Sequence, residues 1–405
     1  MMSQNKRMIS LVKCQDPGEG GVEALSLLES AGSFRPPQDG VVFLKPNIVV
    51  AAPFDLSPAE FTDPRLVASM VRYFRDRGAK KVIVGERPAW GGSCQDAFRA
   101  SGIGEIVREN GGELCDLDRE PEVWVPIDGH VFQAMRLPRP LVEADLVVNL
   151  PKLKTHFLTG VTVGIKNLFG CIRYEDRKKY HREIDLAPVL VDLLRALQPG
   201  LTVVDGVQAM EGFGPHAGTA VELGVVMAGT DAVAVDALGT YLMGVDPQGL
   251  AVLQYVQKLG MGSIDVADIE VIGEKAEDVK RNFLPPLFRF ISEHDNVQVY
   301  AGGVCPGCRP RIPTVPLDCD PSKKYAVIIG REPIAVRPDL DVDEIWMVGN
   351  CGVRAGMAYV LRRAFQGGFP KGVPRVVKVP GCPPLDWYSQ RVIFPPLREK
   401  GWMTT

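Results

Sequence analysis

Residues 41–86 contain, in order, VVFLKPN (41–47), PRLVASMVRYFRDRGA (64–79) and KKVIVGE (80–86). The two short runs rich in β-branched residues predict strands, and the longer segment between them has the apolar spacing of a helix. Asp63 and Pro64 suit the start of that helix, and Gly78 suits its end. Because a strand, a crossover helix and a second strand usually make the two strands parallel, this segment predicts an α/β fold.

The same alternation extends on both sides, from about residue 8 to about residue 275. Further strands are predicted at MISLV (8–12), ADLVVNL (144–150) and LTVVDG (201–206), and further helices at AFRASGIGEIVRENG (97–111) and LAPVLVDLLRAL (186–197). Continuous apolar strands are typical of a sheet that is covered on both faces. We therefore expect a mainly parallel sheet with helices on both faces.

A domain boundary is predicted near residue 280, where the segment RNFLPPLFRF (281–290) is interrupted by prolines. Beyond it the α/β pattern returns on a smaller scale, with KYAVIIG (324–330), EIWMVG (344–349), AGMAYVLRRAF (355–365) and RVVKVPG (375–381). The sequence predicts one α/β domain at 1–280 and a smaller, cysteine-containing α/β domain at 281–405.

The charge balance of the sequence limits which kinds of molecule the protein is expected to bind. Lys and Arg number 46 against 49 Asp and Glu, so the net charge of −3 offers no general attraction to nucleic acid or to an anionic membrane. No signal peptide and no apolar run long enough to cross a membrane is recognisable. We expect a cytoplasmic protein, in which the 9 cysteines are thiols or metal ligands rather than disulfides.

Polar residues follow the predicted strands of the first domain. Glu86 and Arg87 follow one strand, and the residues expected to bind substrate at the other strand ends are Lys45, Asn47, Asn149, Lys152, Lys154, Asp205 and Glu211. Because parallel strands end at one edge of their sheet, these side chains should meet in a pocket. Several lysines there favour a small anionic ligand, a carboxylate or a phosphate. For each residue taken singly, a solvated loop position or a helix cap is about as good an interpretation.

Three further residues are candidates for catalysis or binding in the same pocket. Lys166 and Asn167 lie among apolar residues in TVGIKNLFG (162–170), and a partly buried lysine needs a partner or a shifted pKa, so Lys166 is the preferred functional amine. His156 and His216 lie in predicted loops and could move protons near neutral pH. The glycines of residues 206–218 predict a flexible loop around the ligand.

Four cysteines of the second domain form a candidate metal site. They occur in CPGC (Cys305, Cys308), GNC (Cys351) and GCPP (Cys382), each in a turn rich in glycine or proline. One CxxC followed by two lone cysteines fits a [4Fe-4S] cluster better than structural zinc, which usually takes ligands in pairs. Zinc and unligated buried thiols stay open as alternatives.

Six short motifs of the first domain occur in a fixed order along the chain: KPN (45–47), TDP (62–64), PKLKTH (151–156), KNLFG (166–170), VDG (204–206) and MEGFGP (210–215). In this order they resemble the family named domain of unknown function 362, over roughly residues 8–275. Many members of that family carry a ferredoxin-like iron–sulfur tail, so the resemblance implies a cluster here by analogy. This chain lacks the ferredoxin cysteine run; its GCPP turn resembles instead the cluster loop of hydrogenase small subunits.

Two kinds of function follow from these patterns. The first is a cytoplasmic iron–sulfur oxidoreductase whose cluster serves an anion-binding cleft; the second is a racemase, isomerase or lyase acting on a carboxylate, with structural cysteines. An electron carrier without a substrate is a third interpretation. The partners that the sequence admits are a small anionic molecule, an electron-transfer protein and a second copy of the chain.

Overall fold

The computed structural model describes residues 7–49, 58–88, 93–156, 159–183, 186–215, 217–284, 296–301, 320, 322–330, 340–366, 368–369 and 372–379. The chain divides into two compact units, which are described separately. Unit 1 comprises Met1–Arg177 and Leu186–Pro285, and unit 2 comprises Lys178–Asp185 and Pro286–Thr405. The division near residue 285 lies five residues beyond the expected boundary at 280.

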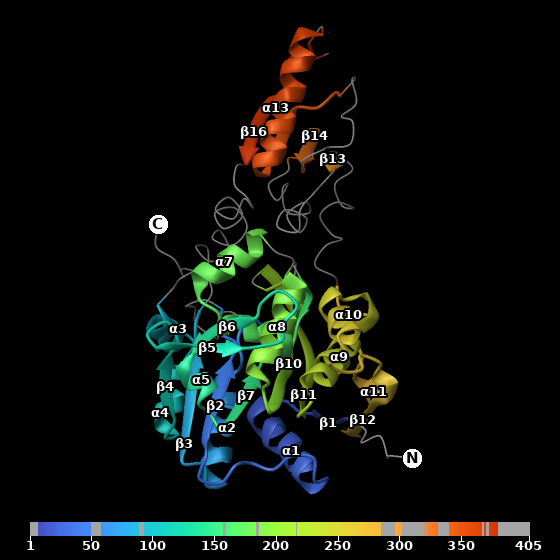
Figure 1. Ribbon diagram of the computed structural model, residues 1–405. Coiled ribbons are helices and arrows are strands. Elements are labelled where there is room, and N and C mark those ends of the chain that lie inside the picture. The colour runs from blue at the N-terminus through green and yellow to red at the C-terminus, as the bar shows by residue number, and fades with distance from the viewer. Residues whose placement is uncertain are drawn as a thin grey trace. The chain divides into compact units, whose positions relative to one another are not determined.

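Unit 1 is built on a mainly parallel sheet, which confirms the predicted α/β class (Figure 1). The strand order is β12-β1-β11-β10-β7-β2-β3-β4, and β8 pairs with both β10 and β9. The strands are β1 (Arg7–Lys13), β2 (Val41–Pro46), β3 (Lys81–Glu86), β4 (Glu113–Asp116), β7 (Leu146–Leu150), β8 (Lys152–His156), β9 (Gly160–Thr162), β10 (Leu201–Phe213), β11 (Ala217–Gly229) and β12 (Ile269–Gly273). A separate antiparallel hairpin consists of β5 (Glu122–Pro126) and β6 (Ala134–Pro138).

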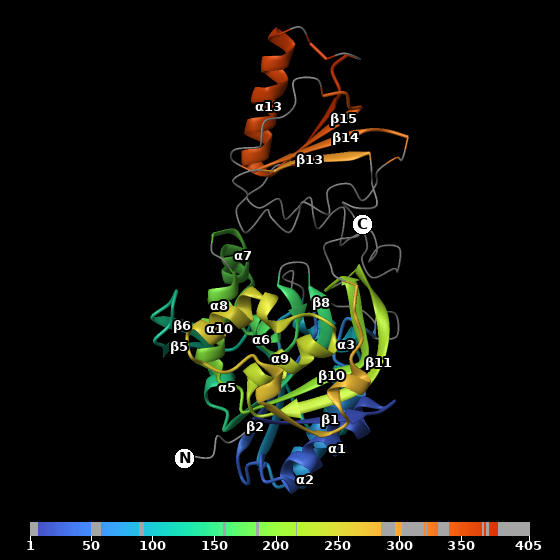
Figure 2. The same ribbon diagram turned by 90° about the vertical axis from the view of Figure 1, so that its right-hand side faces the viewer.

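Helices cover both faces of this sheet (Figures 1 and 2). The adjacent residues Val226 and Met227 of β11 point to opposite faces, Val226 toward α1 and Met227 toward α9. The helices of unit 1 are α1 (Pro17–Ser30), α2 (Pro64–Asp76), α3 (Cys94–Ala100), α4 (Ile103–Glu109), α5 (Arg139–Val142), α6 (Gly164–Asn167), α8 (Leu186–Leu197), α9 (Ala232–Leu242), α10 (Ala251–Lys258) and α11 (Ala276–Val279). Helix α7 (Tyr174–Glu183) begins in unit 1 and ends in unit 2, because the division between the units falls after Arg177. Short 3-10 helices lie at η3 (Leu168–Cys171), η4 (Pro247–Gly249) and η5 (Val266–Asp268).

Local sequence signals account for the helix boundaries. Asp63 caps α2 by accepting a hydrogen bond from the Arg65 N–H, Pro64 occupies the first turn, and Gly78 adopts a positive φ of 87° just past the end. The helix predicted at 97–111 is instead two helices, because Gly102, with φ of 75°, interrupts it between α3 and α4.

The segment of residues 206–218 was expected to be a flexible loop, and this was wrong. Strands β10 and β11 form one long antiparallel hairpin in which Gly212 pairs with Gly218. Its glycines have specific structural reasons: a Cβ on Gly218 would lie 2.4 Å from the Glu211 carbonyl oxygen, closer than any side chain tolerates, and Gly212 adopts a positive φ of 75°. Glycine frequency alone did not separate a crowded strand from an open loop.

Unit 2 contains a four-stranded parallel sheet in the order β13-β14-β15-β16. Its elements are β13 (Val297–Ala301), β14 (Tyr325–Ile329), β15 (Glu344–Val348), α13 (Gly349–Phe365) and β16 (Arg375–Val379). Helix α13 follows β15 directly and lies against the sheet (Figure 2). The core of this unit includes Ile328, Ile345 and Met347. In the part of the chain that the structure describes, no helix is long and apolar enough to span a bilayer.

Candidate ligand-binding site

Four neighbouring parallel strands deliver polar side chains to one edge of the unit 1 sheet. Strands β3, β2, β7 and β10 end in, or pass through, Glu86, Lys45, Asn149 and Asp205. Lys45 lies opposite Asn149, and Asn149 lies opposite Thr202, three residues before Asp205. We call the group that gathers here the strand-end cluster: Lys45, Glu86, Asn149, Lys152, Lys154, Lys166, Asn167 and Asp205.

Two lysines of this cluster are neutralised by buried carboxylates. The Lys45 ammonium lies 2.7 Å from Glu86 Oε2, and the Lys152 ammonium lies 2.9 Å from Asp205 Oδ2. All four side chains are at most 2% exposed. Each carboxylate also accepts a hydrogen bond from a backbone N–H group: Ile48 N donates to Glu86, and Asp63 N donates to Asp205. Buried charges persist only with such partners, so these two pairs fix the ends of their strands.

Lys154 is buried on the same strand as Lys152 but makes a weaker contact. Alternation along β8 places both on one side of the strand. Its ammonium donates to the backbone oxygen of Glu60 at 2.8 Å. Burial is the main cause that lowers the pKa of Lys154 to about 7. The negative charge of Glu60 acts in the opposite direction, and the positive charges of Lys166 and Lys152 lower the pKa further.

Lys166 carries a second amine without a neutralising partner. Its side chain is half-buried in α6, and its ammonium lies 4.7 Å from the centre of the Phe169 ring. Among the residues that the structure describes, none forms a hydrogen bond or an ion pair with this ammonium. Desolvation, together with the charges of Arg177 and Lys45, lowers the pKa of Lys166 to about 7. Close to neutral pH, each of these two lysines is therefore protonated in only part of the molecules.

Helix α6, which carries Lys166, is held by a buried carboxylate on α9. Asp236 accepts hydrogen bonds from the Ile165 N–H at 3.1 and 3.2 Å, and burial raises the pKa of Asp236 to about 7. Asn149 donates to the Gly164 carbonyl at 2.8 Å. A Cβ on Gly164 would lie 2.8 Å from Asp236 Oδ1, so only glycine allows this close approach.

The asparagines of the cluster leave hydrogen-bonding capacity unused. Asn167 donates to Asn149 Oδ1 at 2.8 Å and, more distantly, to the Lys45 carbonyl. The Asn167 Oδ1 atom is buried and has no donor in the described part of the structure, and the same holds for Asn47 Oδ1. A buried acceptor without a donor costs free energy, so a ligand that supplies an O–H or N–H would relieve this cost.

The other predicted site residues have varied positions. Asn47 lies one residue beyond β2, and its N–H donates to Thr62 Oγ1. His156 ends β8, is buried, and pairs in register with Gly160. Glu211 lies six residues along β10 from Asp205, and its carboxylate accepts a hydrogen bond from the Leu284 N–H. His216 lies outside the described residues.

Sequence reasoning missed three residues that shape the cluster. The carbonyl oxygen of Glu60 accepts a hydrogen bond from Lys154, and the carboxylate of Asp236 holds α6. Gly170 leaves room for the ion pair, because a Cβ at this position would lie 3.0 Å from both Lys45 Nζ and Glu86 Oε1. A charge inside the apolar run of α9 was a usable signal for Asp236. Nothing in the local pattern around Glu60 signalled its role.

The expected metal ligands lie mostly outside the described residues, namely Cys305, Cys308 and Cys382. Cys351 is described: it is a half-buried free thiol in the first turn of α13. Within the described ranges, no group of three or more His, Cys, Asp or Glu side chains is arranged to hold a metal ion.

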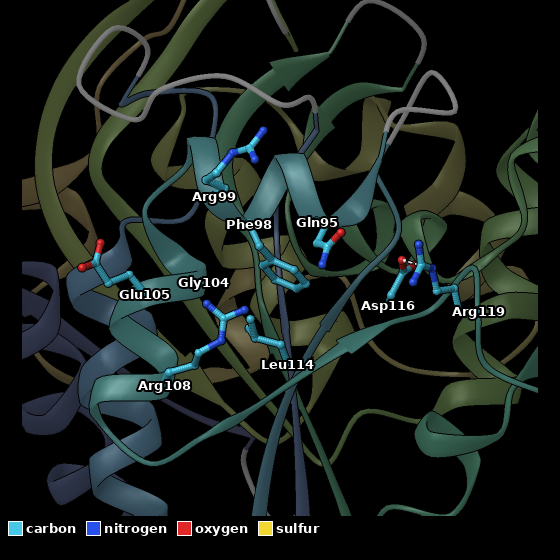
Figure 3. A pocket seen from close by; sticks show the side chains of 9 residues that line it. All are labelled: Gln95, Phe98, Arg99, Gly104, Glu105, Arg108, Leu114, Asp116 and Arg119. Atoms are coloured by element: carbon cyan, nitrogen blue, oxygen red, sulfur yellow. Dashed lines mark ion pairs between the residues drawn. The ribbon is translucent and has the colours of Figure 1, made fainter.

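A separate hollow of about 680 Å³ lies between α3, α4 and the edge strand β4 (Figure 3). It has a floor of Phe98 and Leu114 and a rim of charged side chains, and it shares no residue with the strand-end cluster. Two rim arginines are already paired, Arg99 with Asp96 and Arg119 with Asp116. Because these paired arginines are mostly exposed to solvent, their ion pairs are weak, and the hollow lacks the buried charges of the strand-end cluster.

Comparisons with known proteins give a family and some distant structural likenesses. The family model described as "Domain of unknown function (DUF362)" matches residues 42–241. The thylakoid-associated protein sll1697 of Synechocystis sp. is 30% identical over 277 residues, which cover 63% of this chain and 80% of that protein.

Among solved structures, the lactate racemase apoprotein from Thermoanaerobacterium thermosaccharolyticum is 13% identical with a TM-score of 0.39, over 60% of each chain. A Thermotoga maritima protein is 15% identical with a TM-score of 0.30, over 48% of this chain and 51% of that one. This chain thus spans less than two thirds of either structure, and neither likeness bears on function. The family model and the Synechocystis relative together show that the chain belongs to the DUF362 family.

Proposed function

We propose that unit 1 binds a small organic anion at the strand-end cluster and moves a proton on it with the amines of Lys154 and Lys166. The observation that carries this proposal is the contrast within the cluster: two lysines are paired with carboxylates, whereas these two are not. A group with a pKa close to the working pH is effective both as a proton donor and as an acceptor.

The two amines suit complementary roles. The charge of Lys166 lowers the pKa of Lys154, so the titrations of the two amines are coupled. The state in which one amine is protonated and the other is neutral then supplies a cation for the anion and a base for its proton. Such chemistry is that of a racemase, isomerase or lyase acting on a carboxylate or phosphate.

The unpaired Asn167 Oδ1 indicates that the anion carries a hydroxyl group. A ligand hydroxyl could donate to this acceptor, whereas an unsubstituted carboxylate could not. We therefore expect a hydroxylated anion to bind more tightly than its analogue without the hydroxyl group. A site built to pair a ligand O–H discriminates strongly against ligands that lack it.

Calorimetric titration with glycolate, acetate and inorganic phosphate tests the proposal. Wild-type protein should bind glycolate more tightly than acetate, and Lys166→Met or Lys154→Met should each weaken binding of glycolate by tenfold or more. Lys81→Met is the matched control, because Lys81 pairs with Glu113 on the surface and should not affect binding. Equal affinity in Lys166→Met, Lys154→Met and wild type would refute the proposal.

An iron–sulfur function of unit 2 is the second candidate, and the order of its strands favours it. Because β13, β15 and β16 are parallel, their last residues Ala301, Val348 and Val379 share one sheet edge. In sequence, Cys305, Cys308, Cys351 and Cys382 follow these ends within three to seven residues. Adjacent strands are about 4.8 Å apart and each residue spans up to about 3.5 Å, so segments of three to seven residues are long enough to bring four thiols from these strand ends to one cluster.

We infer that these thiolates hold a [4Fe-4S] cluster, with zinc as the alternative. A bound cluster would supply single-electron transfer, which would make the protein an oxidoreductase with an electron-transfer partner. Anaerobic purification followed by iron, sulfide and zinc analysis separates the two metals. A preparation with stoichiometric zinc, or with neither metal, would refute the cluster. A cytoplasmic location and a homodimer stay predictions.

A further inference from the structure

We propose that Lys166 is a nucleophile that forms an imine with the carbonyl carbon of a small 2-oxo acid or aldehyde acid. This inference rests on the proposed anion site and names a substrate class for it. A primary amine becomes a nucleophile when it is neutral, and enzymes achieve this by desolvating a lysine or by placing cations beside it.

Both conditions hold at Lys166. Its ammonium lies beside the ring of Phe169 rather than beside a carboxylate, and the nearby charges that act on it are those of Lys45 and Arg177, which are positive. The ammonium groups of the other cluster lysines are held by specific contacts. Lys45 and Lys152 lie in buried ion pairs, and Lys154 donates a hydrogen bond to a backbone carbonyl. The half-buried side chain of Lys166 keeps part of its surface accessible to a ligand.

The reaction balances without an oxidant or reductant. The Lys166 nitrogen forms a bond to the carbonyl carbon while the C–O π bond breaks, which gives a carbinolamine after transfer of a proton from nitrogen to oxygen. The carbinolamine hydroxyl then leaves as water with a proton from Lys154, which gives an iminium ion, and the nitrogen returns its remaining proton to the now neutral Lys154 amine to give the neutral imine. Lys154 is suited to this role because its own ammonium is only partly protonated near neutral pH.

Reductive trapping tests the inference directly. Full-length protein would be incubated near neutral pH with glyoxylate and cyanoborohydride, which reduces an imine to a stable secondary amine, and the labelled lysines would be mapped by peptide mass spectrometry. Lys166 should be labelled on the order of 100-fold faster than exposed surface lysines such as Lys13 and Lys80, which serve as internal references. Glycolate, which has no carbonyl group, should protect Lys166.

Two variants keep the test independent of folding. Lys166→Arg retains the positive charge but cannot form the imine, so the fast label should disappear while circular dichroism is unchanged. Lys81→Arg, at a surface ion pair, should leave the label on Lys166 unchanged. Labelling of Lys166 no faster than of Lys80 would overturn the inference.

The outcome also separates this inference from the proposed function. If glycolate binds in a manner that depends on Lys154 but glyoxylate is not trapped, the anion site stands and the nucleophile is refuted. If glycolate does not bind and glyoxylate is not trapped, both are refuted.

Discussion

The two halves of the strand-end cluster use the same residue type for different purposes. Lys45 and Lys152 lie in ion pairs that are buried and supported by backbone donors. Lys154 is buried and Lys166 is half-buried, neither has a carboxylate within ion-pair distance in the described structure, and burial lowers both pKa values to about 7. The paired half holds the sheet edge together, and we propose that the unpaired half is kept at a cost to stability because it serves the function proposed above.

Breaking a pair should have the largest effect. Lys152→Met leaves the Asp205 carboxylate buried without its cation and should lower the free energy of unfolding by about 3–5 kcal/mol, measured by urea denaturation. Lys81→Met, which removes one partner of an exposed pair, should change it by less than about 1 kcal/mol. Similar losses in the two variants would contradict the structural role of the Lys152–Asp205 pair.

Removing an unpaired lysine should change the free energy of unfolding in the opposite direction and stabilise the protein. Lys166→Met replaces a desolvated ammonium by an apolar side chain and should raise the free energy of unfolding by about 2 kcal/mol while weakening glycolate binding. The folded-state pKa of Lys166 lies below its unfolded value, so its penalty is fully present below about pH 7 and fades as the pH rises toward 10. The stabilisation by Lys166→Met should therefore be larger at about pH 6 than at about pH 9; the reverse order would exclude this cause.

The affinity for anions should fall as the pH rises through 7. In the proposed site the anion binds the protonated amine of the pair. The charges that act on Lys166 are those of Arg177 and Lys45, and those that act on Lys154 are Glu60, Lys166, Lys152 and Glu86. Above pH 7 each amine that must gain a proton weakens binding by about tenfold per pH unit. Calorimetric titration with glycolate across this range provides the measurement, and an affinity that does not vary would exclude titrating lysines from the site.

The smallest effect concerns the glycine that passes beside the Lys45–Glu86 pair. A Cβ at residue 170 would lie 3.0 Å from both Lys45 Nζ and Glu86 Oε1, so Gly170→Ala should cost about 1–2 kcal/mol. Gly249→Ala is the matched control, because no atom lies within 4 Å of a Cβ at that position. Equal stability of the two variants would show that the pair can shift without cost.

Much of the fold followed from local patterns. Alternating strands and helices, with a capped start at Asp63 and a glycine stop at Gly78, predicted the parallel core, because these signals depend only on neighbouring residues. The long β10–β11 hairpin was missed, because crowding at Gly218 comes from residues that only the folded chain brings together.

The candidate site shows the same division. The rule that parallel strands end at one edge correctly brought Lys45, Asn149 and Asp205 to neighbouring strands. The sequence did not reveal which lysines have carboxylate partners, because Glu86 reaches Lys45 from another strand and Asp236 holds α6 from a helix 71 residues away. Charge compensation is a property of three-dimensional distance, so the difference between Lys152 and Lys166 required the structure.

The most direct measurement of the central claim is a side-chain NMR titration that follows the ¹³Cε resonances of the lysines, with Lys166 assigned by its loss in Lys166→Met. We predict that Lys154 and Lys166 titrate near pH 7, well below an ordinary lysine. Titration of both at the ordinary lysine value would contradict it and remove the basis for a functional amine in this cluster.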